Sequence, residues 1–423
     1  MTVYALDAAE RKDLLERFLR YVRVDTQSDD AATCFPSTEK QKDLGRILVE
    51  ELKALGCGDA AMDGFGYVFA TLPSNLPAGA PEPPVLGFLA HLDTYPGTSG
   101  ADVRPQVVPA YGGGDLRLPA TGACIPVSQN PNLLKCLGHT LVHTDGRTLL
   151  GADDKAGIAE IMGLLAWLQA HPGFPHGRLR IGFTPDEEVG RGTEHFDVAA
   201  FGAQYAYTLD GSDLGEVEDE TFCADSAVVT LTGHDVHPGY AKGVMVNAVR
   251  AAAALVEELD PAHLPESTEG RASYLHPHDL RGDVTRAELK LLVRAFTEEE
   301  LRAREDALRA AVDRVQARFP GLRAELEVKE GYRNMGYRIA EDPKVLDLAL
   351  EAVKRQGLEP VRKAIRGGTD GSRLSYMGLL TPNLFAGGQS FHSVNEWVSL
   401  DWMAQAVGVC IQLLATWREA SAR

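Results

Sequence analysis

The stretch Val85-Leu86-Gly87-Phe88-Leu89-Ala90-His91 decides the fold class of this chain. Pro83-Pro84 stops local structure just before it, and residues 85–90 then form an unbroken apolar run. A short continuous run of this kind is typical of a strand that is buried on both faces of a parallel sheet. His91 therefore stands at the carboxyl end of a predicted central strand.

The same arrangement returns at later points of the chain. Apolar residues 149–152 precede Asp153 and Asp154, residues 179–183 lead to Asp186-Glu187-Glu188, and residues 205–209 lead to Asp210. After Asp154, apolar side chains recur along one side of a predicted helix: Ile158, Ile161, Met162, Leu165 and Leu168. Strands that alternate with helices predict an α/β domain whose ligands gather at the carboxyl ends of the strands.

The pattern changes near residue 223, and with 423 residues the chain is long enough for two domains. Strands are predicted at 227–232, 287–296 and 323–328, and helices at 247–259 and 298–319. This βα…βαβ order is typical of a ferredoxin-like α+β unit. We therefore expect an α/β main domain with a mixed, mainly parallel sheet, formed by residues 1–222 and 333–423, and interrupted by an inserted lid, residues 223–332.

Local signals complete the expected outline of the main domain. Asp7 followed by Glu10 is a capping-box pattern that predicts a first helix, and a second helix is expected at 39–55. Helices are also predicted at 343–356 and 400–417, with a strand at 381–386 between them. The Gly- and Pro-rich residues 105–143 are interpreted as surface loops.

Composition excludes several classes of protein. The start of the sequence does not read as a signal peptide, and no stretch approaches the roughly 20 apolar residues of a membrane span. We therefore expect a soluble, cytoplasmic protein. The net charge of −18 makes nucleic acid and anionic membranes poor partners. The six cysteines lack C-x-x-C spacing and are expected to be reduced, buried residues without a nucleophilic role.

Five side chains form a candidate metal-ligand set: His91, Asp153, Glu188, Asp210 and His392. Taken singly, each has an ordinary explanation, since an aspartate at a strand end is commonly a helix N-cap and a lone histidine is commonly structural. Taken together, they offer one bridging carboxylate, two further carboxylates and two imidazoles, which suits two zinc ions close together. Cobalt or manganese could occupy the same ligands.

Two more carboxylates fit supporting roles around these ligands. Asp93, two residues after His91, suits a hydrogen bond from the ring N–H of that histidine. Glu187, directly before Glu188, is the candidate general base, which must remain unliganded yet reach the attacking water. The alternative is that Asp186-Glu187-Glu188 is only a helix N-terminus favoured by the macrodipole.

The motifs resemble a known family, the co-catalytic zinc exopeptidases related to carboxypeptidase G2. The resemblance is carried by residues 91–94 (HLDT), 151–157 (GADDKAG), 186–190 (DEEVG) and Asp210-Gly211. Residues 26–28, 236–243, 265–270 and 365–371 narrow it to the tripeptide-aminopeptidase branch, the peptidase T family. These segments span nearly the whole chain.

The resemblance implies a role for each candidate. Asp153 would bridge the two zincs, with His91 and Asp210 on one metal and Glu188 and His392 on the other. Glu187 would be the catalytic base and Asp93 the support of its histidine. The implied reaction is removal of the N-terminal residue from tripeptides, by a water held between two zinc ions.

The resemblance also assigns substrate-binding residues, three in the lid and Arg366 beside the Gly-rich residues 366–371. His237 would steady the tetrahedral intermediate, and Asn247, Arg294 and Arg366 are candidates for holding the substrate carboxylate. A lid that clamps both peptide termini would measure peptide length. Without the resemblance, His237 reads as a turn residue and Arg294 as a solvated strand residue. A lid sheet edge or helix face can also pair with its symmetry mate, so a homodimer is one expectation.

The segment around His392 departs from the family pattern, because Ser393 stands where a glycine is expected. This departure concerns the rim of the pocket and hence side-chain preference. Other substrates for the same centre stay open: a dipeptidase, a carboxypeptidase or an N-acyl amino-acid deacylase would use the same ligands. A metal-free peptide-binding relative is disfavoured, because no ligand and no base is missing.

Overall fold

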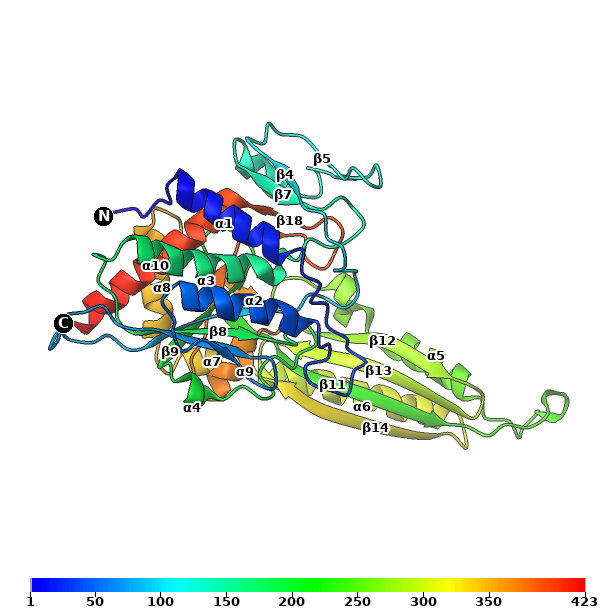
Figure 1. Cartoon of the computed structure of the whole chain (residues 1–423). Coiled ribbons are helices and arrows are strands. Elements are labelled where there is room, and N and C mark those ends of the chain that lie inside the picture. The colour runs from blue at the N-terminus through cyan, green and yellow to red at the C-terminus, as the bar shows by residue number, and fades with distance from the viewer. Residues whose placement is uncertain (1, 423) are drawn as a thin grey trace. The chain divides into compact units, whose positions relative to one another are not determined.

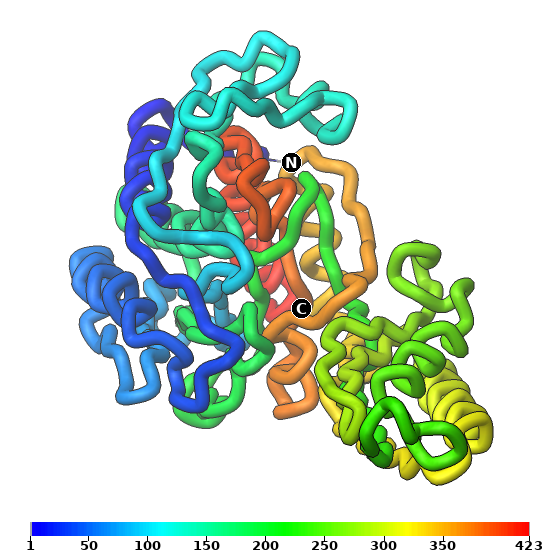
Figure 2. The backbone as a smooth tube through the Cα atoms, turned by 90° about the vertical axis from the view of Figure 1, so that its right-hand side faces the viewer, coloured from blue at the N-terminus to red at the C-terminus, as the bar shows by residue number. Residues whose placement is uncertain are grey.

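The computed structural model describes residues 2–422 and divides the chain into two compact units. The first unit contains the chain up to Asp219, Tyr337–Lys363 and the chain from Thr369 onward. The second unit contains Glu220–Gly336 and Ala364–Gly368. In Figure 2 most of the second unit is the green-to-yellow part of the tube.

A mixed eight-stranded sheet forms the centre of the first unit, in the order β1-β2-β8-β3-β9-β16-β10-β15. Its strands are β1 (Ala61–Met62), β2 (Val68–Leu72), β3 (Leu86–His91), β8 (Leu179–Thr184), β9 (Tyr205–Gly211), β10 (Glu216–Thr221), β15 (Val361–Ile365) and β16 (Asn383–Phe385). Strands β8, β3, β9 and β16 are parallel, whereas the pairs β1–β2, β2–β8 and β10–β16 are antiparallel. Every residue of β3 is buried, which confirms the central strand predicted from its apolar run.

Helices cover both faces of this sheet. Figure 1 shows α1, α3 and α10 on one side, with α4 and α9 on the other. The helices of this unit are α1 (Ala8–Tyr21), α2 (Gln41–Ala54), α3 (Ala152–Ala170), α4 (Val198–Phe201), α8 (Lys344–Arg355), α9 (Asp370–Tyr376) and α10 (Leu400–Ser421), and the short α7 (Gly336–Ile339) begins at the boundary of the units. The predicted capping box of Asp7 and Glu10 is present at the start of α1.

Gly157 allows the close approach of α3 to the sheet. A Cβ atom at this position would lie 1.9 Å from the carbonyl oxygen of Leu209 in β9. Only glycine fits such a contact, because a real side chain would push the helix away from the strand. The first turn of α3 and the end of β9, which carries Asp210, are thereby held together.

Two predictions for the first unit were wrong. Residues 105–143 contain β4 (Gln106–Val108), β5 (Leu116–Arg117), β6 (Cys124–Ile125), the 3₁₀ helix η1 (Pro131–Cys136) and β7 (Leu141–His143). β4 and β7 join β17 (Gly388–Gln389) and β18 (Trp397–Ser399) in a small sheet with its own apolar cluster around Trp397 and Trp402. These strands are too short to show periodicity. The strand expected at 149–152 is absent, and α3 begins at Ala152.

The second unit is a ferredoxin-like α+β unit. Its elements are β11 (Cys223–Thr232), α5 (Ala248–Glu258), β12 (Tyr274–Gly282), β13 (Arg286–Ala295), α6 (Glu298–Arg318) and β14 (Arg323–Tyr332), with the 3₁₀ helices η2 (Pro238–Tyr240), η3 (Pro261–His263) and η4 (Pro265–Ser267). The antiparallel order is β12-β13-β11-β14, and one face packs its alternating apolar residues against α5 and α6. β12 was not predicted, because Pro277 interrupts its pattern. The strand tolerates this proline at the sheet edge, with a register shift between Pro277 and Asp279.

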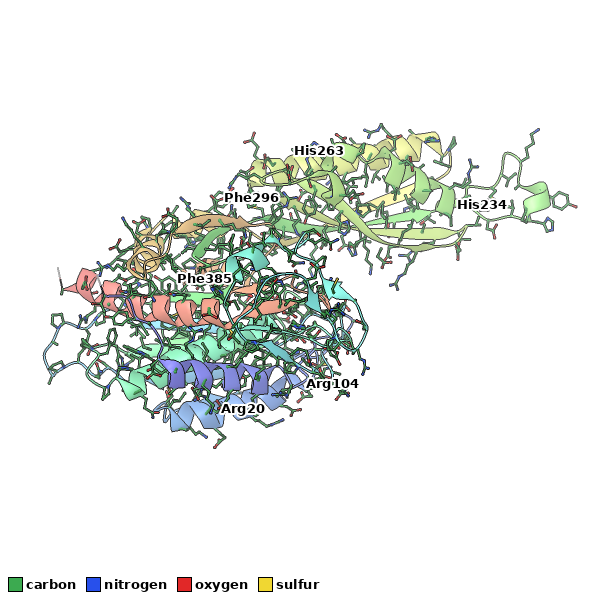
Figure 3. All side chains as sticks on the ribbon, turned by 90° about the horizontal axis from the view of Figure 1, so that it is seen from above. Arg20, Arg104, His234, His263, Phe296 and Phe385 are labelled. Atoms are coloured by element: carbon green, nitrogen blue, oxygen red, sulfur yellow. The ribbon has the colours of Figure 1, made fainter. Side chains whose placement is uncertain are left out.

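The segment between β11 and α5 extends from the end of this sheet, where His234 lies (Figure 3). His234 and Val246 pair across its base, and Tyr240 beyond them is 80% exposed. Among the described residues, none of the helices combines the length and the apolar character that a bilayer span requires.

Candidate metal centre and active site

Three parallel strands bring the predicted ligands to one edge of the central sheet. His91 is the last residue of β3 and lies in register with Thr184, the last residue of β8. Asp210 lies near the end of β9, and its N–H donates to the side chain of Asn383, 3.0 Å away. Because carboxyl ends of parallel strands meet at the same edge, residues far apart in the sequence converge there.

His392 reaches the same place from the loop between β17 and β18. Its backbone is left-handed, with φ 62°, and its carbonyl oxygen accepts a hydrogen bond from the hydroxyl of Thr98 at 2.9 Å. The imidazole stacks on the ring of Tyr95, with centroids 4.1 Å apart and planes 3° from parallel. The loop after β3 therefore holds both the backbone and the ring of His392.

Asp153 lies between the two histidines. Its Oδ1 is 2.9 Å from Nε2 of His91, and its Oδ2 is 3.1 Å from Nε2 of His392. Each histidine has a second carboxylate of its own. Oδ1 of Asp210 is 3.6 Å from Nε2 of His91, and Oε2 of Glu188 is 2.9 Å from Nε2 of His392. The structure thus brings all five predicted ligands together, with one carboxylate shared by two imidazole–carboxylate pairs.

This donor set fits divalent metal ions. Two groups of side chains, one of His91, Asp154 and Asp210 and the other of His91, Asp153 and Glu188, place their ligand atoms within 4.8 Å of one another. Oε1 of Glu188 is buried and has no hydrogen-bond partner within the described chain, which leaves it free for a cation. Imidazole nitrogens and carboxylate oxygens are ligands that catalytic zinc sites use.

Asp154 is an alternative to Asp153 as a metal ligand. Both oxygens of Asp154 already accept backbone hydrogen bonds, from the N–H of His91 at 3.1 Å and from that of Gly157 at 3.2 Å. Asp153, in contrast, turns both oxygens toward the histidines. Asp153 is therefore the better candidate ligand, whereas Asp154 links the end of β3 to α3.

The electrostatics of the centre also favour a cation. Burial, with repulsion from Asp153, raises the pKa of Asp210 to about 7 and that of Glu188 to about 8. Burial likewise raises the pKa of Glu187 well above its usual range. Burial alone would lower the pKa of His392, but its hydrogen bonds to Asp153 and Glu188 raise it to about 11. The centre thus holds more buried carboxylates than positively charged groups. Bound divalent cations would reduce the repulsion among these carboxylates.

Asp93 supports this centre differently from the sequence prediction. Nδ1 of His91 lies 3.0 Å from the backbone carbonyl of Asp93, and the carboxylate is farther away at 3.4 Å. The fully buried carboxylate accepts hydrogen bonds from the N–H groups of Glu187 at 2.9 Å and Glu188 at 3.2 Å. These two glutamates follow β8 in a turn, so the predicted alternative of a helix N-terminus at 186–188 is wrong.

Two buried carboxylates beside the centre were not predicted from the sequence. Glu396 accepts hydrogen bonds from the N–H groups of Leu150, Gly151 and Asp153 at 2.7, 2.8 and 3.0 Å. Asp370, at the start of α9, accepts one from the hydroxyl of Thr184 at 2.6 Å. Asp370 lies in a segment that carried the family resemblance and Glu396 lies in the segment that departs from it, but a single sequence gives no sign that their partners are another strand or backbone amides.

The four predicted substrate-binding residues all lie in the second unit. His237 is exposed and caps η2, where its Nδ1 accepts from the N–H of Gly239 at 3.1 Å. Asn247 caps α5 through the N–H of Arg250. Arg294 on β13 donates from Nη1 to the carbonyls of Asp225 and Val293, both at 2.9 Å. Arg366 donates to the 268–272 turn, at 2.7 Å to Gly270 and 3.1 Å to Ala272.

Comparisons with known proteins agree with the resemblance found in the sequence. Residues 129–416 match the model of Peptidase family M20/M25/M40. Peptidase T of Geobacillus kaustophilus is 46% identical over 405 residues, which cover 96% of this chain and 98% of the relative. Among solved structures, aminopeptidase PepT from Bacillus cereus has a TM-score of 0.74 at 21% identity, covering 96% of this chain and 98% of that one. A tripeptidase from Staphylococcus aureus has a TM-score of 0.76 at 21% identity, covering 97% and 99%. The chain belongs to the M20/M25/M40 peptidase family, and relatives that are 45–46% identical to it over nearly its whole length are named peptidase T.

Proposed function

We propose that this chain is a tripeptide aminopeptidase that depends on two divalent metal ions, with zinc as the metal. The observation that carries the proposal is the position of Asp153, whose two oxygens face His91 and His392 separately. A bridging carboxylate with an imidazole and a carboxylate on either side is the ligand set of a two-metal hydrolase. The relatives named peptidase T support the choice of a peptide substrate.

The five ligands would hold the metals, which supply Lewis acidity toward the scissile carbonyl and lower the pKa of water. The chain itself supplies the base. Glu187 is anchored through its N–H to Asp93, and no hydrogen bond within the described residues engages its carboxylate. Such a free, partly buried carboxylate can take the proton from the attacking water and return it to the leaving amine.

We further propose that the second unit recognises the ends of the peptide. Both hydrogen bonds of Arg294 within the described chain come from Nη1, so the rest of the guanidinium fork is available to a terminal carboxylate. Asn247 is a second candidate for that carboxylate. Arg366 ranks behind them, because its guanidinium already holds the 268–272 turn. His237, exposed in the segment after β11, would steady the tetrahedral oxyanion.

The proposed setting is the cytoplasm, where the enzyme would serve peptide catabolism. The six cysteines are all free, as expected for a protein of a reducing compartment. Four of them are buried as predicted, whereas Cys34 and Cys124 are exposed, so for these two the prediction of burial was wrong. A homodimer through the ferredoxin-like unit is part of the proposal, and the mass in solution tests it.

The function is tested with four substrates, with and without a chelator: Ala-Ala-Ala, its N-acetylated form, Ala-Ala and Ala-Ala-Ala-Ala. We expect chelator-sensitive release of alanine from the free tripeptide alone. Cleavage of the acetylated tripeptide instead would indicate a deacylase, and cleavage of Ala-Ala would indicate a dipeptidase. Activity that is insensitive to chelation would contradict the metal dependence.

A further inference from the structure

The turn that carries Glu187 begins at a residue in an unusual conformation. Asp186 has φ +60°, in the left-handed region that L residues rarely adopt, and it is fully buried. Aspartate tolerates this region better than most residues, but its conformation still needs support from its surroundings. Because Asp186 precedes Glu187 directly, its backbone sets the direction of the next side chain.

Two residues from another part of the chain provide this support. Gln41, the first residue of α2 and itself fully buried, donates from Nε2 to Oδ1 of Asp186 at 2.7 Å. Its Oε1 accepts from the N–H of Asp186 at 3.0 Å. The amide of Gln41 therefore binds both the side chain and the backbone of Asp186. Ser37 donates its N–H to Oδ2 at 2.6 Å and its hydroxyl to Oδ1.

The rest of the turn is tied down as well. The N–H of Arg191 donates to the carbonyl of Asp186 at 2.9 Å, and the N–H of Gly190 donates to that of Glu187 at 2.7 Å. On the other side, the carboxylate of Asp93 accepts the N–H groups of Glu187 and Glu188. The Glu187 carboxylate is thus the unrestrained end of a segment whose backbone is fixed at every residue from 186 to 188.

We propose that Ser37 and Gln41 are positioning residues for the general base. By holding Asp186 in its left-handed turn, they set the direction in which Glu187 projects, while Glu188 is held separately by its contact with His392. This inference rests on the proposed role of Glu187. It predicts that removing the hydrogen bonds from Ser37 or Gln41 to Asp186 slows the chemical step more than it weakens substrate binding or metal binding.

The test compares Gln41→Glu, Ser37→Ala and Asp186→Asn with the wild-type chain. Gln41→Glu replaces the amide donor with an oxygen that repels Asp186. Asp186→Asn keeps a residue that tolerates the left-handed region but places amide hydrogens opposite the donors of Ser37 and Gln41. The matched control is Gln412→Glu. Gln412 is a buried glutamine of α10 that donates to the carbonyls of Thr2 and Arg355, away from the centre.

We expect Gln41→Glu and Asp186→Asn to lower kcat by up to about 100-fold, as small misplacements of a catalytic group do, with KM and metal content unchanged. Ser37→Ala, which keeps the backbone bond, should have a smaller effect in the same direction. Gln412→Glu should leave kcat unchanged. Unchanged kcat in both Gln41→Glu and Asp186→Asn, or loss of metal in parallel with kcat, would overturn the inference.

A double variant separates this inference from the proposed function. If Gln41 acts through Glu187, adding Gln41→Glu to Glu187→Gln should not lower the residual rate further. A further loss of rate, equal to that in the wild-type background, would show that Gln41 acts elsewhere. If Glu187→Gln alone keeps full activity, the base assignment fails, and any effect of Gln41→Glu must then have another cause. Measurements of the unfolding midpoint for each variant exclude general destabilisation as that cause.

Discussion

The carboxylate of Asp93 accepts the backbone N–H of Glu187 at 2.9 Å. The same carboxylate accepts the N–H of Glu188 at 3.2 Å and lies 3.4 Å from Nδ1 of His91. One buried side chain after β3 therefore connects a candidate metal ligand with the turn after the neighbouring strand β8. The parallel register of these strands, which pairs His91 with Thr184, makes this connection possible.

Replacing Asp93 with asparagine should uncouple these groups. The amide nitrogen of asparagine would face a backbone N–H in place of an acceptor, so at least one of the two bonds is lost. Groups that orient metal ligands typically contribute about 10- to 100-fold to metal affinity or activity, and we expect Asp93→Asn to fall in that range. Metal titration and kcat measure the effect. Wild-type values of both would show that Asp93 only fills space.

Replacing Glu187 with glutamine should separate catalysis from metal binding. The shape of the side chain is kept, but glutamine cannot accept the proton of the attacking water. We expect kcat to fall by about 100- to 10,000-fold, the usual contribution of a general base, while both metals stay bound. Elemental analysis and steady-state kinetics on Ala-Ala-Ala measure the two quantities.

Glu188→Gln is the control for Glu187→Gln, because it changes the neighbouring carboxylate in the same way. Oε2 of Glu188 lies 2.9 Å from His392, and its Oε1 has no other partner in the described chain, so this variant should lose metal as well as activity. If Glu187→Gln loses metal while Glu188→Gln retains it, the two roles are reversed.

Much of the fold was predictable, because long elements carry strong periodic patterns. The apolar run before His91 identified the central strand, and the pattern after Asp154 identified α3. The elements that were missed lack such patterns. β12 contains Pro277, and β4 has only three residues, so neither shows an alternation that could be recognised.

The convergence of four candidate ligands (His91, Asp153, Glu188 and Asp210) was predictable, because each follows an apolar run or lies in a motif, and strand ends meet at one edge of the sheet. His392 lies in the segment that departs from the family pattern. The supports of these ligands were not predictable. Gln41 binds Asp186 across 145 residues, and Glu396 binds Gly151 across 245. Such contacts depend on the packing of whole elements. The main partners of the Asp93 carboxylate were also not predictable. Because Asp93 is two residues from His91 in the sequence, a bond to that histidine was expected, and the bonds to the turn after β8 were not.

Removing the shared carboxylate should abolish metal binding and catalysis together. Asp153→Ala takes away the oxygens that lie 2.9 Å from His91 and 3.1 Å from His392. Because a bridging ligand serves both metals, neither site should remain intact. Metal content after equilibrium dialysis and activity should both be lost. Asp145→Ala, which changes another buried aspartate, is the control and should keep both. Retention of two metals per chain by Asp153→Ala would rule out the bridging role.

Glu396 should matter for both stability and metal binding, because it replaces a local cap at the start of α3. Gly151, the N-cap residue of that helix, has no side chain to offer, and Glu396 accepts the N–H groups of Leu150, Gly151 and Asp153 in its place. Hydrogen bonds to a charged group contribute about 1.5–3 kcal/mol each, and glutamine at this position would keep only one of the two acceptor oxygens. We therefore expect Glu396→Gln to lower the free energy of unfolding by about 2 kcal/mol or more.

The effect on metal binding follows from the third of these bonds, since the N–H of Asp153 belongs to the bridging residue itself. Unfolding measured in the presence of a chelator reports the loss of stability alone, and metal titration of the folded protein reports the loss of affinity. Glu396→Asp, which keeps the charge on a shorter side chain, should lie between the wild-type chain and Glu396→Gln in both measurements. If Glu396→Gln lowers stability but binds metal with unchanged affinity, Glu396 stabilises α3 without orienting Asp153.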